Sequence, residues 1–513
     1  MNEQHNKKIA IFSMIVTFLF VVAIIALVYD TGAFPGKNSR AQILKKYTTA
    51  LCEDQSIIPG DFYDTNGVRL AYSNRNEDKT IETTYIDNLA YSQLLGYPGR
   101  RILDITATNT DAVIEGRDAY RLMSYLGDES WGKAGLYKTA NNYSDEGMDV
   151  QLTIDQDLQL KVYDLLSNEC GGPLGYGSAV VMDAETGAIK AMVSLPTFDV
   201  SDVNSMKKQM YEMDKNTGVG TGYPVSYKGA VAPGSTFKVL MAVSLIDHDM
   251  KNYTYSASDL NVDGYIIRNS IAAPGEQLTY KEGLKYSNNA FFASAALELG
   301  EEDIFETAGK FGLVQHENVE DDYVETDFGY VNYGFPYNVE NDVTLAICGY
   351  GQGEVELTTV SEAMIFQGLA NDGKVMRPYM VESISDKKGK EYYKGKPEKL
   401  SQATSKKTCK LMRSALKDTV DYTFDEYGIA QNVRETFNNY NVVGKTGTAD
   451  VVQISNGVEN RLNNQWYASY SNDNDKNYVV IVNHCNVPTG NYGAALMPLT
   501  ASIYDYIYNE WQK

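Results

Sequence analysis

The stretch Val231-Ala-Pro-Gly-Ser-Thr-Phe-Lys-Val-Leu240 places a serine and a lysine three residues apart, where a turn leads into an apolar segment. Pro233-Gly234 is typical of a turn, and the apolar run that follows, VLMAVSLI, predicts a buried helix. We therefore expect Ser235 at the start of this helix and Lys238 one turn later on the same face. A buried lysine with a lowered pKa could take the serine proton, which would make Ser235 a nucleophile without any histidine.

The S-x-x-K pattern alone is weak evidence for such a site. It occurs five times in the chain, at Ser130, Ser205, Ser235, Ser385 and Ser414. Only Ser235 combines a preceding turn, a helix start and an apolar continuation. Even there, the ordinary alternative is a serine that simply caps a helix.

Two further motifs strengthen the functional interpretation. The segment Tyr286-Ser-Asn-Asn-Ala-Phe-Phe292 contains S-x-N, and Val443-Gly-Lys-Thr-Gly-Thr448 contains K-T-G; each pattern occurs once in the chain. Taken singly, the first could be a loop or a helix cap and the second the edge of a strand. In this order, 52 and then 158 residues apart, the three motifs together indicate a single site.

This set of motifs resembles that of the penicillin-binding proteins and serine β-lactamases, which combine S-x-x-K, S-x-N and K-T-G in one active site. The resemblance extends to SAVVMDAETGAIKAMVSLPTFD at 178–199, to the segment 349–378 and to GDFYDTNGVRLA near the N-terminus, so it covers roughly residues 55–513. Pro59 stands where this family usually has arginine. The chain is most similar to short-stemmed class B penicillin-binding proteins of the PbpA type.

The resemblance implies a peptidoglycan D,D-transpeptidase, a serine-type enzyme that cross-links stem peptides and that β-lactams inhibit covalently. Ser235 would attack the penultimate D-Ala carbonyl, with Lys238 as the general base. Ser287 and Lys445 would relay the proton to the leaving amine, while Asn289 would hold the substrate amide. No metal and no cofactor is implied.

The resemblance also assigns roles to the K-T-G strand. Thr446, Gly447 and Thr448 would bind substrate, and Lys445 would join the two threonines in receiving the substrate carboxylate. The backbone N–H groups of Ser235 and Thr448 would form the oxyanion hole.

Composition excludes several other classes of protein. The chain has 513 residues and a net charge of −22, with 67 acidic against 45 basic side chains. Such a balance argues against nucleic-acid binding, which requires basic surface. Only four histidines occur, which nearly excludes histidine-based catalysis or a histidine-rich metal site. The five cysteines show no metal-ligand spacing, and we predict no disulfide.

A membrane anchor is predicted near the N-terminus. Residues 9–29 read IAIFSMIVTFLFVVAIIALVY, without a charged side chain and long enough for a bilayer-spanning helix. A cleaved signal peptide is the alternative, but the segment is longer than the usual apolar core of one and no clear cleavage site follows. Lys7 and Lys8 favour a cytoplasmic N-terminus. The rest of the chain would then lie outside the cell, or in the periplasm, as part of a single-pass protein of the bacterial membrane.

We therefore divide the chain into four parts. Residues 1–8 are expected to be a cytoplasmic tail, 9–29 a transmembrane signal-anchor, 30–150 an N-terminal stem domain that does not bind penicillin, and 151–513 the transpeptidase domain. By family analogy, a glycan polymerase of the SEDS type is a candidate partner at the membrane.

The predicted fold is α+β. Strands are expected at 175–195, as a hairpin that turns at Asp183–Gly187, and again between 439 and 485; helices are expected between 235 and 420 and from about Ala494 to Trp511. The resemblance implies a central, mainly antiparallel sheet with helices on both faces. We expect the acidic stretch from Glu317 to Asp342 to be a solvated loop, because it lacks the regular spacing of a calcium loop.

Three alternatives on the same fold remain at this stage: a β-lactamase, a D,D-carboxypeptidase, or a protein that mainly acts as a scaffold in cell-wall synthesis. A β-lactamase would need a group that activates water for fast deacylation, and would hardly need a stem and an anchor. A nucleotide-binding P-loop at 439–446 is excluded, because Asn439 occupies the position of the first glycine.

Overall fold

The computed structural model describes residues 60–95, 149–201, 224–314, 322–336, 339, 341–455, 458–472, 476–490 and 492–511. The predicted tail at 1–8, the predicted anchor at 9–29 and most of the predicted stem lie outside these residues. Within the described ranges, no helix has both the length and the apolar composition needed to cross a membrane.

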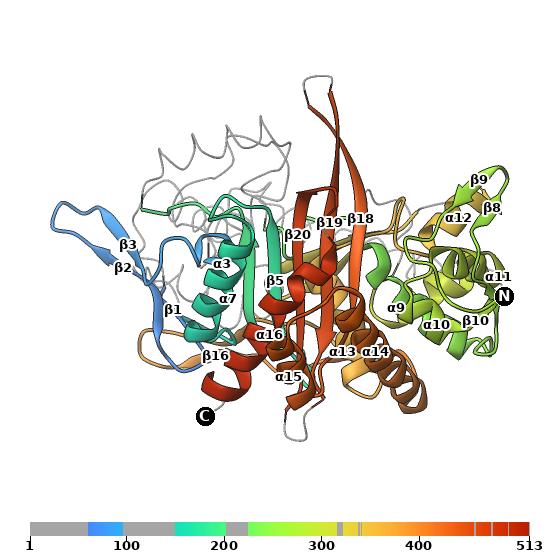
Figure 1. Ribbon diagram of the computed structural model, residues 1–513. Helices are drawn as coiled ribbons and strands as arrows, with labels where there is room; N and C mark the ends of the chain where they lie inside the picture. The colour runs from blue at the N-terminus through green and yellow to red at the C-terminus, as the bar shows by residue number, and fades with distance from the viewer. Residues whose placement is uncertain are drawn as a thin grey trace, which may run out of the picture.

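A five-stranded antiparallel sheet forms the centre of the molecule (Figure 1). Its strands, in spatial order, are β18 (Val443–Ser455), β19 (Val458–Tyr470), β20 (Tyr478–Pro488), β5 (Gly177–Asp183) and β6 (Ile189–Leu195). All seven residues of β5 are buried, as are the first six of β20. Side chains alternate between the two faces of a strand, so a fully buried strand needs cover on both faces of the sheet.

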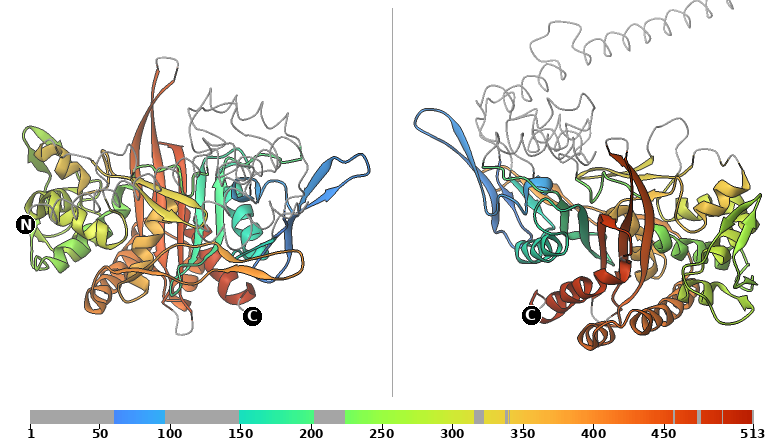
Figure 2. Two further views of the ribbon diagram at one scale, coloured as in Figure 1. Left: turned by 180° about the vertical axis from the view of Figure 1, so that it is seen from behind. Right: turned by 45° about the horizontal axis from the view of Figure 1, so that its top comes forward.

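Helices provide this cover (Figures 1 and 2). On one face, α13 (Thr359–Ala370) packs against β19, β20 and β5, and all of its residues are buried. On the other face, α7 (Gln156–Glu169) packs against β5 and β6, and α16 (Met497–Tyr506) packs against β20 and α7. Asp155 caps α7 by accepting a hydrogen bond from the Leu158 N–H at 3.0 Å.

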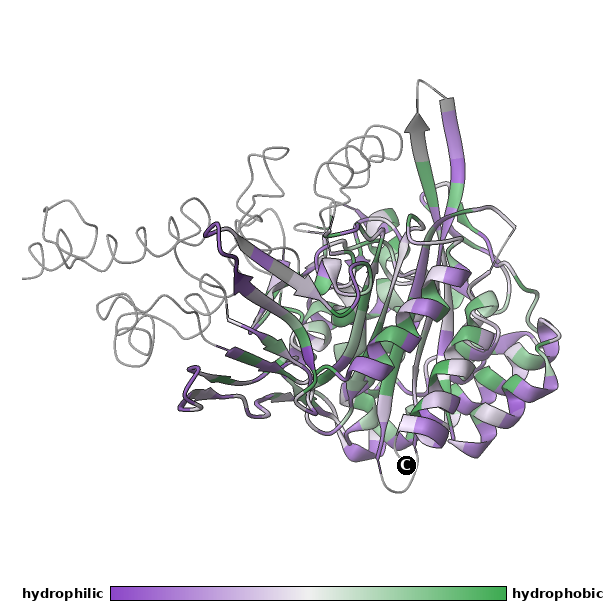
Figure 3. Cartoon of the chain, turned by 90° about the vertical axis from the view of Figure 1, so that its left-hand side faces the viewer, coloured by the Kyte–Doolittle hydropathy of each residue, from purple (hydrophilic) through white to green (hydrophobic). Residues whose placement is uncertain are grey.

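The remaining helices gather beyond the edge strand β18 and around the ends of the sheet, which confirms the helix-rich middle of the chain. They are the 3-10 turn η3 (Gly234–Thr236), α9 (Lys238–Asp247), α10 (Tyr280–Lys285), α11 (Asn289–Lys310), α12 (Asp342–Cys348), α14 (Lys406–Glu426) and α15 (Gln431–Asn439), with α3 (Ser92–Leu95), η4 (Gly493–Leu496) and η5 (Ile507–Trp511) closer to the chain ends. Figure 3 shows apolar residues gathered in the central sheet and hydrophilic residues on the outer turns of the helices.

Short strands form small pairings between these helices. They are β7 (Tyr255–Ser256) with β10 (Gln277–Leu278), β8 (Leu260–Val262) with β9 (Tyr265–Ile267), and β14 (Lys374–Met376) with β17 (Lys399–Gln402).

A second, six-stranded sheet joins segments that are distant in sequence. Its order is β16 (Glu391–Lys394), β15 (Val381–Ser385), β4 (Asp149–Leu152), β1 (Phe62–Tyr63), β2 (Arg69–Arg75) and β3 (Ile81–Tyr85). The turn between β1 and β2 contains Asn66 and Gly67. Strands from both sides of the predicted boundary at 150 share this sheet, so the stem is tied to the larger domain by backbone hydrogen bonds.

The prediction of a solvated loop from Glu317 to Asp342 is wrong for residues 322–334. The structure has a hairpin there, β11 (Asp322–Thr326) and β12 (Gly329–Gly334), and β12 continues to pair with β13 (Glu356–Leu357). Asp327, in the hairpin turn, is 4 % exposed, and its carboxylate accepts hydrogen bonds from the backbone N–H groups of Met380 (2.8 Å) and Val381 (2.6 Å). The Asp327 carboxylate, which we expected to face solvent, is therefore a buried acceptor that holds the start of β15 in place.

We expect Asp327→Ala to lower the free energy of unfolding by about 2–4 kcal/mol, because it leaves two buried N–H groups without this acceptor and each costs about 1–3 kcal/mol. Denaturant unfolding of the full chain in detergent measures the change. Glu325→Ala is the matched control, since Glu325 belongs to the same hairpin and is exposed. Equal stability of the two variants would contradict this role for Asp327.

Candidate active site

Ser235 and Lys238 meet at the start of α9, as the sequence predicts. Ser235 lies in the turn η3, and α9 begins directly at Lys238. The Lys238 Nζ atom is 2.9 Å from the Ser235 Oγ atom. Lys238 is fully buried at 0 % exposure, and burial together with the nearby charge of Lys445 holds its pKa well below the usual range for lysine. Such a lysine can be a neutral amine, and thus a base, near neutral pH.

The other contacts of Lys238 determine where its lone pair would point. Its Nζ atom also lies 2.6 Å from Asn289 Oδ1 and 2.8 Å from the Ser287 carbonyl oxygen. A neutral amine has two N–H donors, and these two oxygens can accept both. The remaining lone pair is then directed at the hydroxyl of Ser235, which is the arrangement needed to receive its proton.

Ser287 adopts a backbone conformation that is unusual for serine, with φ at +51°. It lies just after α10, where the Ser287 N–H bonds the Leu284 carbonyl at 3.1 Å and the Asn288 N–H bonds the Gly283 carbonyl at 2.9 Å. This is the Schellman pattern of a helix C-terminus, and its left-handed position is usually a glycine. A serine there is under strain, which suggests that its side chain is needed.

The Ser287 hydroxyl indeed lies between two amines. Its Oγ atom is 3.3 Å from the Nζ atom of Lys238 and 3.1 Å from that of Lys445. Asn288, the middle residue of S-N-N, caps α11 by accepting from the Phe291 N–H. The capping interpretation of this motif is therefore correct for Asn288, while Ser287 and Asn289 contact Lys238.

Lys445, on the edge strand β18, completes the cluster. Its Nζ atom donates to Ser287 Oγ and, at 3.0 Å, to the Thr446 carbonyl. The side chain is buried, and burial lowers the pKa of Lys445 to about 7. Two amines that share one serine hydroxyl in a buried site resist carrying charge at the same time, so their proton affinities are linked.

Glycines let the K-T-G strand lie directly against the serine turn. A Cβ atom on Gly234, whose φ is +57°, would lie 2.7 Å from the Thr448 carbonyl oxygen, and one on Gly447 would lie 2.4 Å from the Pro233 carbonyl oxygen. No larger residue fits at either position without a shift of the backbone. Thr446 and Thr448 are partly exposed beside this turn, so they remain accessible to a ligand.

The structure adds three residues that sequence reasoning did not single out. The Gly351 carbonyl accepts the Gly234 N–H at 2.8 Å, and Trp466 Nε1 donates to the Ala232 carbonyl at 3.0 Å, so both hold the serine turn in place. Glu362, on α13, is fully buried beside the hydroxyl of Thr236, and burial raises its pKa to about 8. Gly351 lies in the segment 349–378 that carried the family resemblance, but nothing in the sequence marks Trp466 or Glu362.

The strain at Ser287 leads to a prediction about stability. We expect Ser287→Gly to be more stable than Ser287→Ala by about 1 kcal/mol, because glycine adopts the left-handed conformation without the cost of a Cβ atom. Both variants lack the hydroxyl, so the difference between their unfolding free energies isolates the backbone strain. If alanine proves as stable as glycine, the position is not strained.

Comparison with known proteins supports one family. Residues 177–505 match the family described as "Penicillin binding protein transpeptidase domain". The chain is 24 % identical over 501 residues to the peptidoglycan D,D-transpeptidase PbpA of Mycolicibacterium smegmatis, a match that covers 93 % of this chain and 92 % of that protein. It is 25 % identical to penicillin-binding protein 3 of Bacillus subtilis and 27 % identical to stage V sporulation protein D of the same organism, over 65 % and 68 % of this chain. These matches span about half the length of the two Bacillus proteins, 47 % and 54 %.

Solved structures agree on the fold. The ceftriaxone acyl-enzyme complex of penicillin-binding protein A from Mycobacterium tuberculosis superposes with a TM-score of 0.71 at 19 % identity, covering 89 % of this chain and all of that one. The α+β transpeptidase fold implied by the motifs is thus confirmed. The chain belongs to the penicillin-binding protein transpeptidase family, and it is similar to the PbpA protein of M. smegmatis along nearly its whole length.

Proposed function

We propose that this protein is a serine D,D-transpeptidase that cross-links the stem peptides of peptidoglycan through an acyl-enzyme on Ser235. The observation that carries the proposal is the contact between the Ser235 hydroxyl and a fully buried lysine whose other two hydrogen bonds are already taken by Ser287 and Asn289. That geometry activates an alcohol as a nucleophile with an amine as its base.

In the first step, Ser235 Oγ forms a bond to the carbonyl carbon of the penultimate D-Ala, and Lys238 takes the hydroxyl proton. When the bond to the terminal D-Ala breaks, its nitrogen must receive a proton. Ser287 can transfer that proton, because its hydroxyl lies within 3.3 Å of the Lys238 amine and 3.1 Å of the Lys445 amine. The relay thus returns the proton to the leaving group and leaves an ester on Ser235.

Two further groups of interactions complete the proposal. The backbone N–H groups of Ser235 and Thr448 would bind the developing oxyanion, a role supported by the close approach of the Gly234 and Thr448 backbones. Lys445 with the hydroxyls of Thr446 and Thr448 would hold the terminal carboxylate of the donor peptide, and Gly447 lets this strand lie beside the serine turn. Asn289, which bonds the Lys238 amine, would also hold the substrate amide.

An amine from a second stem peptide would then attack the ester and form the cross-link. A β-lactam would acylate Ser235 in place of the donor peptide, as cephalosporin and penicillin do in the acyl-enzyme complexes of the M. tuberculosis protein. Water in place of the amine would give a carboxypeptidase, and fast attack by water on a β-lactam ester would give a β-lactamase. The match to PbpA along nearly its whole length favours the transpeptidase.

We further propose that residues 9–29 anchor the protein in the bacterial membrane, with 1–8 in the cytoplasm and the stem and transpeptidase domains, 30–150 and 151–513, outside. The uncharged apolar sequence of 9–29 supports the anchor. Peptidoglycan substrates lie on that side of the membrane, and a SEDS-type polymerase that supplies glycan strands is the proposed partner.

Labelling with a fluorescent penicillin tests the nucleophile. We expect the full-length protein to retain the label covalently through denaturing electrophoresis and Ser235→Ala to show none. Ser414→Ala is the matched control, because Ser414 also belongs to an S-x-x-K sequence but is exposed on α14. Labelling of Ser235→Ala would disprove the assignment, while rapid loss of label from the wild type would favour a β-lactamase.

The coupling of the two lysines predicts a pH dependence. Lys238 acts as a base only when neutral, so the acylation rate should rise with pH as Lys238 loses its proton. The charge of Lys445 lowers the pKa of Lys238. Lys445→Gln removes that charge, so the rise in acylation rate should move to higher pH. The acylation rate itself should also fall by about 100-fold or more, because the relay is lost. Stopped-flow acylation across pH measures both effects. A rise that stays at the same pH would show that the two amines are not coupled.

A further inference from the structure

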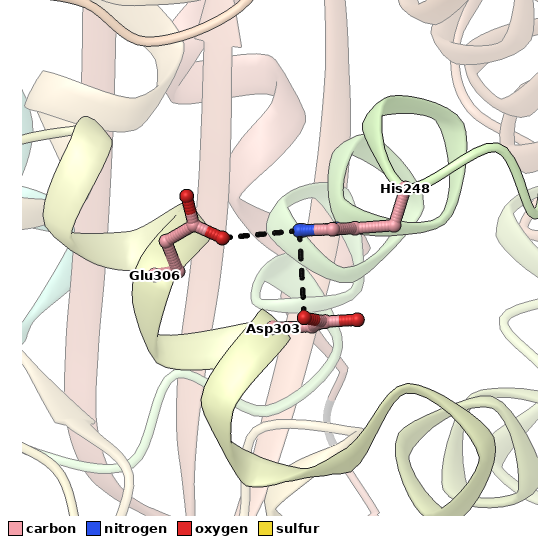
Figure 4. A group of neighbouring side chains, drawn as sticks. All are labelled: His248, Asp303 and Glu306. Carbon is pink, nitrogen blue, oxygen red and sulfur yellow. Dashed lines mark hydrogen bonds and ion pairs between the residues drawn. The ribbon is translucent and has the colours of Figure 1, made fainter.

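A histidine and two carboxylates meet where α9 and α11 pack together, away from the proposed active site (Figure 4). His248 follows the last residue of α9, and Asp303 and Glu306 lie three residues apart on α11, so both carboxylates lie on the same face of that helix. Fifty-five residues separate His248 from Asp303 in the sequence, which is why no ligand spacing was visible there.

The distances among these groups suit a small metal ion. His248 Nε2 lies 3.3 Å from Glu306 Oε2 and 3.7 Å from Asp303 Oδ1, and one ligand atom from each residue lies within 4.8 Å of the other two. Around a tetrahedral zinc ion, bonds of about 2.0–2.1 Å place neighbouring ligand atoms about 3.4 Å apart. Small rotations of the two carboxylates would bring all three atoms to that spacing.

The imidazole is held in the orientation of a metal ligand. His248 Nδ1 lies 3.0 Å from the Ser244 carbonyl oxygen, which can only accept, and 3.3 Å from the Ser244 hydroxyl. We infer the tautomer with the proton on Nδ1, because it satisfies the contact with the carbonyl. The Nε2 atom then directs a lone pair at two carboxylate oxygens. Three electron-pair donors facing one another require a cation between them, either a proton on Nε2 or a metal ion. A backbone carbonyl behind the ring is the usual outer partner of a zinc-bound histidine.

Glu306 is likewise prepared to bind through one oxygen. Lys310 forms an ion pair with its Oε1 atom at 2.8 Å, which leaves Oε2 facing His248. The side chains are 18 % exposed at His248 and 53 % at Glu306, so an ion can enter and water can occupy the fourth position.

We propose that His248, Asp303 and Glu306 form a structural site for a divalent transition metal ion, for which zinc is the best match. One imidazole with two carboxylates suits zinc, whereas magnesium and calcium prefer oxygen ligands alone. Lys238 begins α9 and Asn289 begins α11, and these two residues bond each other at 2.6 Å. His248 lies at the other end of α9, and Asp303 and Glu306 lie in the part of α11 that follows its kink at Gly300. A bound ion would therefore hold α9 against α11 at the end remote from the active site. The proposal departs from the resemblance, which implies no metal.

Thermal unfolding of the full chain in detergent, after treatment with a chelator, tests the proposal. We expect zinc chloride to raise the unfolding temperature of the wild type and magnesium chloride to leave it unchanged. At a free zinc concentration 100 times the dissociation constant, the folding equilibrium should shift about 100-fold towards the native state.

Variants locate the site. His248→Ala and Asp303→Asn should abolish the zinc-dependent shift, whereas Glu302→Gln, which alters an exposed carboxylate next to Asp303, should retain it. Equilibrium dialysis should find one zinc ion fewer per chain in the first two variants, a readout that holds even if a variant is itself less stable. No zinc-dependent shift in the wild type, or the same shift and stoichiometry in His248→Ala, would overturn the proposal.

Discussion

The burial of the Lys238 amine is the constraint on which the rest of the site depends. An ammonium group removed from water loses several kcal/mol of solvation, and here the second amine of Lys445 adds repulsion. Among the described residues, no carboxylate bonds the Lys238 amine; its contacts are with two hydroxyls, a carbonyl and an amide oxygen. These neutral acceptors suit an uncharged amine. The burial that makes a charged ammonium group unfavourable therefore also lowers the pKa of Lys238, so that its amine can be neutral and accept a proton.

The site combines residues from three segments of the chain, and the central sheet explains how these segments meet. Lys238 begins α9, Ser287 and Asn289 flank the junction of α10 and α11, and Lys445 belongs to the edge strand β18. An edge strand has one side free of strand pairing, so the serine turn can pack there. Gly234 and Gly447 bring the two backbones into contact, while Gly351 and Trp466 hold the turn from behind.

The structure brings the three predicted motifs together, and each motif was visible in the sequence because it is local. Turn residues before a helix fixed the relation of Ser235 to Lys238, and alternating or continuous apolar runs predicted the strands of the central sheet. The errors arose where distant contacts override local composition. Asp327 belongs to an acidic run, yet its carboxylate is buried and accepts hydrogen bonds from backbone N–H groups 53 and 54 residues away. Glu362 and Trp466 approach the serine turn only because α13 and β19 pack beneath it, so no local motif indicates them. The cluster around His248 likewise forms only where α9 packs against α11.

Ser287 shows how stability and reactivity are balanced in this arrangement. The C-terminal hydrogen bonds of α10 and the cap that Asn288 provides for α11 fix the backbone on both sides, so the left-handed conformation of Ser287 is imposed by its neighbours. Glycine would satisfy that backbone at lower cost but would supply no hydroxyl. An ordinary helix end would accommodate serine without strain but would place the hydroxyl elsewhere. A strained serine keeps a hydroxyl oxygen between two amines, since the junction of two helices holds it there.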